Sequence, residues 1–215
     1  MDREAPPFFI LDFYENSDYI FKWWKGLEYF MKKNLGVKPV LFPMPVLIVA
    51  TYNEDGTANA MNAAWGGIHD TNQIGVCLAP EHKTSENLMR TKAFTVSMAD
   101  ASHVAACDYV GIVSGHQVPD KLTKAGFTVT KSEYVNAPVI NELGMCLECE
   151  VQSYDEKTGC LVGNIKNVSA DEAVLTDDKI DPAKLEPITY DPENHNYIKL
   201  GEVVGKAFSD GKSLM

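Results

Sequence analysis

The sequence predicts a mainly β protein, with antiparallel strands forming a barrel and a few short helices added to it. Several β-branched runs are bounded by turn sequences, which is typical of antiparallel strands with tight connections. The clearest hairpin joins the strands 144–154 and 160–170 through the turn DEKTG. Because short strands leave exposed edges unless the sheet closes on itself, this pattern favours a closed barrel.

The other predicted strands lie in the first half of the chain. The run PVLIVATY at 45–52 is a strand, NEDG at 53–56 is its turn, and residues 57–64 return as the partner strand. Two further strands are QIGVCLA at 73–79 and AFTVSM at 93–98. With the long hairpin, they supply the wall of the barrel.

Two helices are predicted between and after these strands. The first begins near Lys83 or Thr84. The second follows Ser102, a good N-cap residue, and ends at Gly111, because glycine commonly stops a helix.

The last part of the chain, from residue 171, begins with a stretch that does not have the pattern of a strand or a helix. Residues 171–194 are acidic and interrupted by prolines, which predicts an extended excursion over the surface. The run NYIKLGEVVG at 196–205 then predicts the final strand.

Residues 1–30 are predicted to be a separate amphipathic extension. In SDYIFKWWKGLEYFMKK the apolar residues recur at helical spacing and the lysines lie mostly opposite. Three interpretations stay open. The helix packs against the domain or a partner subunit, it lies at a membrane surface, or Met31 is the natural start and residues 1–30 are an upstream extension. The apolar positions are Ile20, Trp23, Trp24, Leu27, Phe30 and Met31, and the lysines are Lys22, Lys25 and Lys32.

Charge and composition narrow the class of protein. Acidic residues outnumber basic ones 30 to 19, for a net charge of −11, so the footprint of a nucleic-acid-binding protein is missing. No apolar stretch approaches the roughly 20 residues that a membrane-spanning helix needs. The five cysteines lack the spacing of a disulfide framework, and the start MDREAPP lacks the basic region of an export signal. We therefore expect a cytoplasmic protein of 215 residues.

No side chain stands out as a metal ligand or nucleophile. Strand alternation points the sulfurs of Cys146 and Cys149 to opposite faces, and the five histidines are scattered, so no metal site is expected. The sequence around Ser114 is not the G-x-S-x-G elbow of a hydrolase, and neither G-x-G-x-x-G nor a P-loop is present. We therefore expect no catalytic residue, and chemistry supplied by a bound group.

The stretch HKTSEN at 82–87 is suited to a phosphate. Lys83 supplies a cation, while Thr84 and Ser85 offer hydroxyls and backbone N–H groups at a helix start. A plain capped helix explains the same residues equally well.

The stretch NAMNAAWGG at 59–67 is suited to a flat ring. Its alanines and glycines let such a ring approach backbone N–H groups, and Asn59 and Asn62 can bond carbonyls or hydroxyls. The alternative is a tightly packed barrel strand with a buried Trp65.

Together these motifs resemble the flavin reductase-like family, whose domain is the FMN-binding split barrel. The resemblance covers about residues 31–207 and rests on several motifs in the expected order. They are LFPMPVLIVATYNEDGTANAMNAAWGG, HKTSENL followed by AFTVSM, DYVGIVSGHQVPDKL, LECEV, and the final YDP and Y-x-x-LG elements within DEAVLTDDKIDPAKLEPITYDPENHNYIKLGEVVGK. By this resemblance, residues 31–215 are one flavin reductase-like FMN-binding domain.

The resemblance implies a six-stranded antiparallel Greek-key split barrel that binds FMN noncovalently near the interface of a homodimer. The implied activity is oxidoreductase chemistry in which NADH or NADPH is a transient electron donor. Free flavin, ferric iron or a partner protein is the acceptor. Two alternatives stay open: a flavoredoxin-like electron carrier without its own NAD(P)H activity, and a noncatalytic barrel for another small ligand.

The resemblance also implies which residues contact the cofactor. The flavin-contacting motif covers Asn59, Met61, Asn62, Ala63, Ala64 and Trp65, and the phosphate turn covers His82, Lys83, Thr84 and Ser85. Ser97, Lys121 and Tyr197 are the remaining predicted contacts, with Tyr197 shielding the ring. Three positions depart from the pattern, since Ser97, His116 and Ser169 stand where many relatives have Asn, Arg and His.

Overall fold

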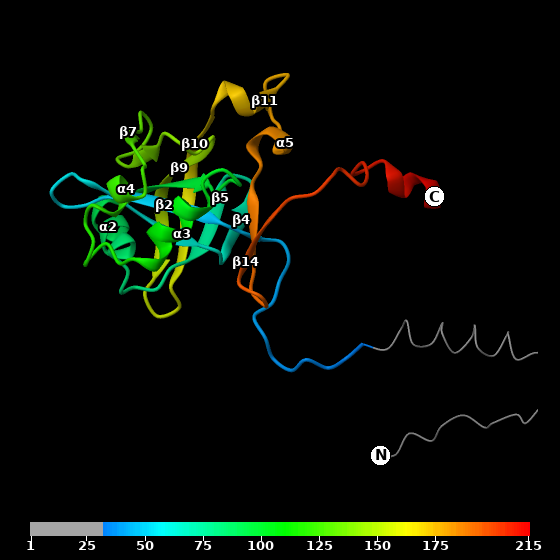
Figure 1. Ribbon diagram of the computed structural model, residues 1–215, viewed down its shortest axis with the longest axis horizontal. Coiled ribbons are helices and arrows are strands. Elements are labelled where there is room, and N and C mark those ends of the chain that lie inside the picture. Colours follow the sequence, from blue (N-terminus) through cyan, green and yellow to red (C-terminus); the bar gives the residue numbers. More distant parts are fainter. Residues whose placement is uncertain (1–31) are drawn as a thin grey trace, which may run out of the picture. The chain divides into compact units, whose positions relative to one another are not determined.

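The computed structural model describes residues 32–215. The chain divides into two units, Met1–Pro39 and Val40–Met215. In the first unit, residues 32–39 form neither helix nor strand, and the predicted amphipathic helix and the alternative start at Met31 lie outside the described residues. All the helices and strands described below belong to the second unit (Figure 1).

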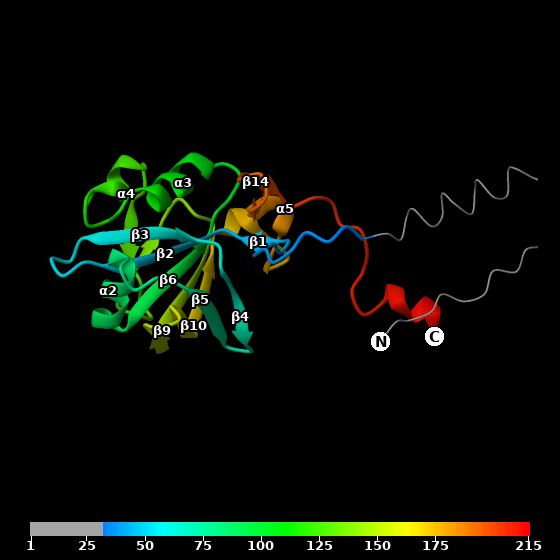
Figure 2. The ribbon, with the colours of Figure 1, turned by 90° about the horizontal axis from the view of Figure 1, so that it is seen from below.

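The second unit is built on one curled antiparallel sheet, seen from two directions in Figures 1 and 2. The order of its strands is β3-β2-β6-β9-β10-β5-β4. Every predicted strand of the barrel wall is present, and 93–98 and 160–170 have the predicted ends. The strand Gly66–Asp70 was not predicted. The strands are β2 (Leu47–Tyr52), β3 (Ala58–Ala63), β4 (Gly66–Asp70), β5 (Gln73–Cys77), β6 (Ala93–Met98), β9 (Met145–Asp155) and β10 (Cys160–Ala170).

The two end strands of this sheet are consecutive in the chain. β3 pairs with β2 at one end, β4 pairs with β5 at the other, and only Ala64 and Trp65 separate them. If β3 and β4 are taken as one bent strand, six strands form the wall, as expected for a split barrel. The bend requires Gly66, because a Cβ there would lie 2.8 Å from Leu47 Cδ1 and 2.9 Å from the Gly75 carbonyl oxygen.

Apolar side chains pack on both faces of the central strands. Leu47 and Val49 of β2 face a core cluster that includes Leu88 of the first helix, whereas Ile48 and Ala50 face a cluster that includes Val110 of the second. This alternation follows the two-residue repeat of a strand. All six side chains are at most 2% exposed, and complete burial of a leucine, isoleucine or valine side chain contributes about 1.5–3 kcal/mol.

The first predicted helix is confirmed, and the predicted ends of the second are wrong. Helix α2 (Lys83–Thr91) begins at the expected residue, while α3 (Val104–Ile112) starts after His103. The helix start has no side-chain cap; Asp100 instead accepts from the backbone N–H groups of Ser102 and His103, in the turn before the helix, at 2.8 and 3.0 Å. Gly111 lies inside α3 instead of ending it. A Cβ there would lie 2.8 Å from Asn62 Cβ, so glycine serves close packing at this position.

The expectation of an extended excursion over 171–194 is partly wrong. Residues Ile188–Asp191 form β13, which pairs with β1 (Met44–Pro45) and β14 (Asn196–Lys199) in a three-stranded sheet. Buried Ile188 and Thr189 fix this strand, and the Thr189 hydroxyl bonds both backbone groups of Met44. The final strand ends at Lys199, because residues 200–205 pair with no described strand.

The remaining elements are short. They are α4 (Lys121–Lys124), β7 (Val129–Lys131), β8 (Pro138–Ile140), the 3-10 helix η1 (Glu172–Val174), β11 (Leu175–Thr176), β12 (Lys179–Ile180), α5 (Pro182–Leu185) and the 3-10 helix η2 (Asp210–Leu214). Among residues 32–215, no helix has the length and apolar character needed to cross a membrane.

Candidate functional site

The two predicted asparagines lie on opposite faces of β3. Asn59 points toward α2, where its side-chain amide donates to the Thr84 hydroxyl at 2.8 Å. Asn62 points toward α3, where its amide donates to the Cys107 carbonyl at 3.2 Å. The site therefore consists of two parts, one between β3 and α2 and the other between β3 and α3.

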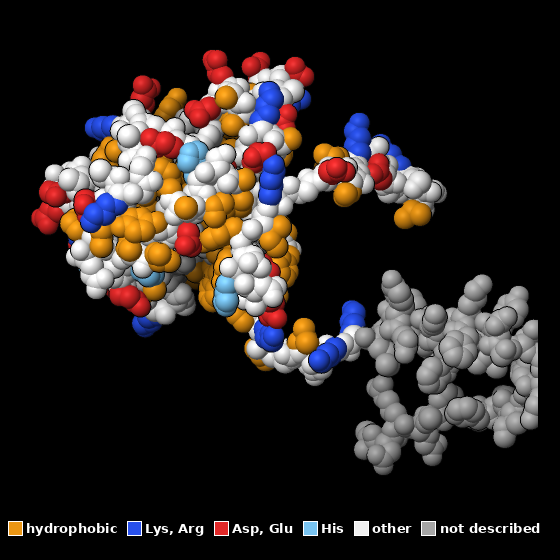
Figure 3. Space-filling view, in the orientation of Figure 1, with side chains coloured by type: hydrophobic (Ala, Val, Ile, Leu, Met, Phe, Trp, Pro, Cys, Tyr) orange, Lys and Arg blue, Asp and Glu red, His pale blue; other side chains and the backbone are white. Residues whose placement is uncertain are grey.

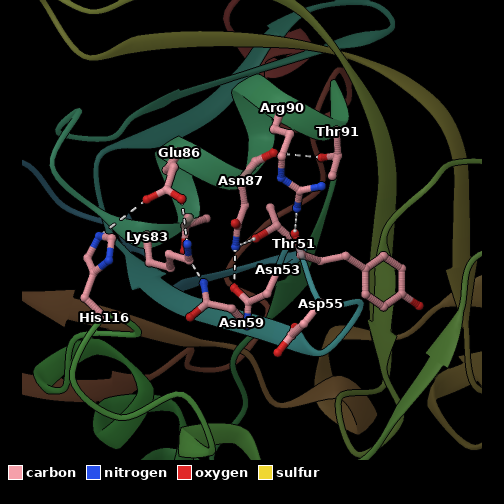
Figure 4. A network of polar contacts seen from close by, with 12 residues as sticks. Thr51, Asn53, Asp55, Asn59, Lys83, Glu86, Asn87, Arg90, Thr91 and His116 are labelled. Atoms are coloured by element: carbon pink, nitrogen blue, oxygen red, sulfur yellow. Dashed lines mark hydrogen bonds and ion pairs between the residues drawn. The ribbon is translucent and has the colours of Figure 1, made fainter.

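The α2 part is a buried polar network, drawn in Figure 4. Asn59 and Thr84 are each 1% exposed, and the Ser85 hydroxyl donates to the Ala79 carbonyl at 2.7 Å. Asn87 of the same helix donates to Thr51 and Asn53 at the opposite end of the network. The two hydroxyls predicted for phosphate binding thus already bond the protein, and they hold the turn before α2 against β3.

Charged groups surround the start of α2. Lys83 Nζ lies 2.6 Å from Glu86 Oε1, and His116 Nε2 lies 3.9 Å from Glu86 Oε2 (Figure 4). The hydrogen bond from Lys83 lowers the pKa of Glu86, so this carboxylate stays ionised between the two basic side chains. An anion at this place would compete with Glu86 for Lys83 and His116.

The N-terminus of α2 has no side-chain cap. The N-cap residue His82 is exposed and its side chain bonds none of the first N–H groups. A nine-residue helix with unsatisfied N–H groups at its start attracts an anion through those groups and through its dipole.

The loop after α3 closes over this part of the site. Gly115 approaches so closely that a Cβ would lie 2.2 Å from Asn59 Oδ1 and 3.2 Å from Lys83 Cβ. Behind the loop, Lys121 is 3% exposed, and its ammonium donates to the carbonyls of Val110 and Val113 at 2.9 and 3.0 Å. Burial lowers the pKa of Lys121 to about 8. The ammonium therefore holds the C-terminal end of α3, from which the loop starts.

The α3 part contains a cavity of about 370 Å³. Three of the predicted residues line it, namely Asn62, Ala64 and Tyr197. Sequence reasoning missed the other lining residues, which are Asp108, Gly111, Ile112, Tyr190 and His195.

Tyr197 joins three elements at this cavity. Its hydroxyl donates to Asp108 Oδ1 at 2.7 Å and accepts from Asn62 Nδ2 at 3.4 Å, which links β14 to α3 and β3. Burial, and then the Asp108 carboxylate, raise the pKa of Tyr197 well above its usual value. This phenol therefore stays protonated and keeps donating to Asp108.

The backbone of β3 also faces the site. Within the described chain β3 pairs with β2 alone, so alternate N–H and C=O groups between Ala58 and Ala63 point away from the sheet. The small side chain of Ala64, which lines the cavity, leaves room beside these groups. A planar ligand with donors and acceptors on its edge fits such a strand.

Several residues predicted to contact the cofactor are buried in the core, and Trp65 is exposed. Met61 and Ala63 pack against the barrel core, and Ser97 is completely buried beside Cys146. Trp65 is 58% exposed, so the alternative of a buried Trp bracing the wall is wrong. A ligand in contact with the described surface reaches Trp65 without rearrangement, and does not reach Ser97.

A larger cavity of the described chain lies elsewhere and has the wrong charge for a phosphate. It has a volume of about 710 Å³, and none of the predicted cofactor residues lines it. Its acidic lining residues Asp55 and Asp120 both have lowered pKa values, through hydrogen bonds from Thr57 and Lys124 respectively. Two ionised carboxylates would repel a phosphate, so we place the candidate site at β3, α2 and α3.

The missed residues carried weak signals in the sequence. Tyr190 lies in the YDP element, and its hydroxyl contacts His195 Nδ1 at 2.7 Å. Asp108 lies in a segment predicted to be helical, with nothing to show that it faces Tyr197. Only the tertiary structure brings these three residues together.

Comparison with known proteins gives one family. The model of the flavin reductase like domain matches residues 40–195. Flavoredoxin of Desulfovibrio vulgaris (Miyazaki F) is a similar solved structure, with a TM-score of 0.81 and 36% identity over 84% of this chain and all of that chain. Flavoredoxin from Methanosarcina acetivorans is also similar, with a TM-score of 0.78 and 30% identity over 86% of this chain and all of that chain.

A curated relative matches over a shorter stretch. It is an uncharacterized protein of Aeropyrum pernix, 28% identical over 114 residues, which are 52% of this chain and 43% of the relative. The chain thus spans less than half the length of that relative. The domain match and the two flavoredoxin structures agree on the fold and cover most of this chain. The chain belongs to the flavin reductase-like family.

Proposed function

We propose that residues 31–215 bind FMN and act as an NAD(P)H-dependent oxidoreductase of flavin reductase type. Family membership supports a flavin-binding oxidoreductase function. The observation that carries the proposal is the position of β3, whose open backbone edge runs between an uncapped helix start and the cavity lined by Asn62, Ala64 and Tyr197. From Asn59 to Ala64 this strand extends about 17 Å, at about 3.3 Å per residue, so it can contact both ends of one elongated ligand.

The two parts of the site suit the two ends of FMN. The N–H groups of Lys83 to Ser85 at the start of α2, together with Lys83 and His116, would hold the phosphate. The β3 edge, Asn62 and Ala64 would hold the ring, with Tyr197 beside it and Trp65 accessible at the bend. When bound, the flavin supplies the electron-transfer chemistry, so no acid or base of the protein is needed for it.

The chain's own residues position and insulate the cofactor. The donation from Tyr197 to Asp108 fixes the phenol ring at the cavity wall. Lys121 holds the end of α3, and Gly115 lets the following loop lie on Asn59 and Lys83. These contacts fix the site before ligand binding, which lowers the entropic cost of binding.

The electron donor is proposed to bind transiently. The sequence lacks G-x-G-x-x-G, so we propose that NADH or NADPH approaches an exposed face of the flavin without a dedicated nucleotide fold. The proposed acceptor is a free flavin, ferric iron or a redox protein. All five cysteines are free thiols, which supports a reducing, cytoplasmic location.

We further propose that the protein is a homodimer with the site near the interface. Exposed apolar side chains gather at and after the bend and at the end of α3, with Trp65 58%, Ile68 73% and Ile112 73% exposed. Ile198 and Leu200, after Tyr197 in the chain, are each 45% exposed. The space-filling view shows orange apolar surface in the region where Figure 1 draws β4 and β14 (Figure 3). Large exposed apolar patches are typical of subunit interfaces.

An anaerobic titration tests the proposed function. The purified full chain is reconstituted with FMN, and the oxidised flavin spectrum is followed on addition of NADH and, separately, NADPH. Bleaching by either nucleotide supports the oxidoreductase. A chain that takes up no FMN would contradict the proposal and would leave a barrel for another ligand, which mass spectrometry of the denatured supernatant would identify.

One observation favours a second candidate, a flavin-binding electron carrier. Both of the similar structures above are called flavoredoxins, at 36% and 30% identity. In this case the bound flavin stays oxidised with either nucleotide, and bleaches with dithionite or a reduced redox protein.

A further inference from the structure

Two exposed cysteines face each other across neighbouring strands, apart from the proposed flavin contacts. Cys77 at the end of β5 is the register partner of Cys160 at the start of β10. Their sulfur atoms lie 3.9 Å apart. Directly opposed side chains on an antiparallel pair are the closest cross-strand neighbours in a sheet.

The hydrogen-bond pattern places Cys77 and Cys160 at a position where the Cα atoms of the two strands lie close together. The next pair outward is hydrogen-bonded, since the Leu78 N–H donates to the Gly159 carbonyl at 2.8 Å. The Cys77 N–H points the other way and donates to the Trp65 carbonyl at 2.7 Å. Hydrogen-bonded and non-hydrogen-bonded pairs alternate, so Cys77 and Cys160 form a non-hydrogen-bonded pair, whose Cα atoms are about 4.5 Å apart. That separation lies within the range of about 4.4–6.8 Å found for disulfides.

The other three cysteines differ in exposure and in reactivity. Cys107, Cys146 and Cys149 are at most 2% exposed. Burial raises their pKa values to about 12, 11 and 12. The pKa of Cys77 is raised too, first by desolvation, so exposure is what separates the pair from these three thiols. A disulfide reagent cannot reach the buried thiols, which serve as an internal comparison.

We propose that Cys77 and Cys160 form a dithiol site that exchanges with disulfide substrates and closes reversibly into a cross-strand disulfide. A thiolate of the pair attacks one sulfur of an external disulfide, and the first thiol leaves. The second cysteine then attacks the mixed disulfide, forms the Cys77–Cys160 bond and releases the second thiol. The dithiol loses two electrons, the external disulfide gains them, and the two protons of the pair end on the released thiols.

The position of the pair gives the exchange a structural consequence. Bond formation needs the two sulfurs to approach from 3.9 Å to about 2.05 Å, a movement that side-chain rotation supplies without a change of register. The closed disulfide would tie β10 to β5 at the residue whose N–H bonds Trp65. The proposal rests on this geometry alone and holds whether or not the chain binds FMN.

Oxidation by glutathione disulfide tests the site. The reduced full chain is incubated without oxygen in mixtures of reduced and oxidised glutathione, quenched with acid, alkylated, and analysed by intact mass and by non-reducing peptide mapping. We expect the loss of two alkylatable thiols per chain and a peptide cross-link joining Cys77 to Cys160, both reversed by excess reduced glutathione. The buried cysteines should remain alkylatable after unfolding.

Two variants distinguish disulfide formation between Cys77 and Cys160 from unspecific oxidation of thiols. Cys160→Ser should accumulate a mixed disulfide of glutathione on Cys77 and give no cross-link. Cys146→Ser removes a buried thiol and should form the Cys77–Cys160 cross-link like the natural chain. If Cys146→Ser does not fold, Cys107→Ala is the control instead. Separate glutathione adducts on Cys77 and Cys160, a disulfide between two chains, or a pair that stays reduced while Cys160→Ser is modified would each overturn the proposal.

Discussion

The side-chain amide of Asn59 donates to the hydroxyl of Thr84 across 2.8 Å, and both side chains are 1% exposed. This hydrogen bond joins the edge strand β3 to the first turn of α2. Removal of either partner leaves the other buried and unsatisfied, which costs about 1–3 kcal/mol.

We therefore expect Asn59→Ala and Thr84→Ala to be non-additive in stability. Each single variant should lose about 1–3 kcal/mol in the free energy of unfolding, and the double variant should lose clearly less than the sum. Urea denaturation of the four proteins measures the coupling. The exposed pair Thr130 and Asn141, with a hydrogen bond of 2.8 Å, is the matched control and should couple weakly. Additive losses at Asn59 and Thr84 would contradict the bond.

Gly115→Ala tests the closeness of the loop. The new Cβ would lie 2.2 Å from Asn59 Oδ1, so we expect a loss of about 1–3 kcal/mol in unfolding free energy and weaker FMN retention. Gly67→Ala is the control, because nothing lies within 4 Å of its Cβ. Equal urea midpoints for the two variants would show that the loop does not rest on Asn59.

Removing the positive charge of Lys83 and removing the negative charge of Glu86 should change the FMN affinity in opposite directions. Lys83→Ala removes a charge-assisted contact worth about 1.5–3 kcal/mol, so the Kd should rise about 10- to 100-fold. Glu86→Gln removes the anion that competes for Lys83 and should lower the Kd. Lys124→Ala, which breaks a similar exposed pair with Asp120 at 2.9 Å, should leave it unchanged. Flavin fluorescence gives all four values, and a Kd unaffected by Lys83→Ala would remove the phosphate assignment.

Lys121 should make stability depend on pH in the alkaline range. Burial lowers its pKa from 10.5 to about 8 in the folded chain, so the unfolded chain binds this proton more tightly. Stability then rises with pH between about 8 and 10.5, by up to about 3 kcal/mol in total. Urea unfolding of the natural chain and of Lys121→Met at several pH values isolates this contribution. A constant difference between the two proteins across that window would contradict the burial of a protonated Lys121.

Trp65 should matter for binding and little for folding. Since 58% of it is exposed, Trp65→Ala should change the unfolding free energy by less than about 1 kcal/mol. We expect the same variant to weaken FMN binding, whereas Val203→Ala, which alters a residue that is 93% exposed and lies in no strand, should not. Parallel thermal melts and flavin titrations distinguish the two effects, and a stability loss without a change in affinity would reverse the assignment.

Most of the barrel could be predicted from local sequence patterns. The β-branched runs and the Asp-Gly turn specify the hairpins because the strand period and the turn conformation are local properties. Strand β13 was missed because Pro187 and Pro192 flank it, and its pairing with Met44 depends on residues far away in the chain. The prediction that Gly111 ends the helix is wrong, because glycine is needed there for close contact with Asn62, and that contact depends on the tertiary structure.

The site could be predicted less completely than the fold. Asn62, Ala64 and Tyr197 do meet at one cavity. The hydroxyls of Thr84 and Ser85 instead bond Asn59 and the Ala79 carbonyl, and the Lys121 ammonium bonds the end of α3. Residue type shows which groups can bind a phosphate. It does not show which of them the fold has already used.

The bend at Ala64 and Trp65 has a consequence for the evolution of the chain. The single stretch 58–70 supplies both end strands of the sheet, β3 and β4. Its length must therefore match the distance around the sheet formed by the other strands. An inserted residue there would shift one half of the stretch against its partner strand, and a backbone cut there would turn the ring into an open sheet. Length variation among relatives is therefore expected to collect in turns such as 53–56 and 156–159, and a circular permutation would succeed at those turns and fail at the bend.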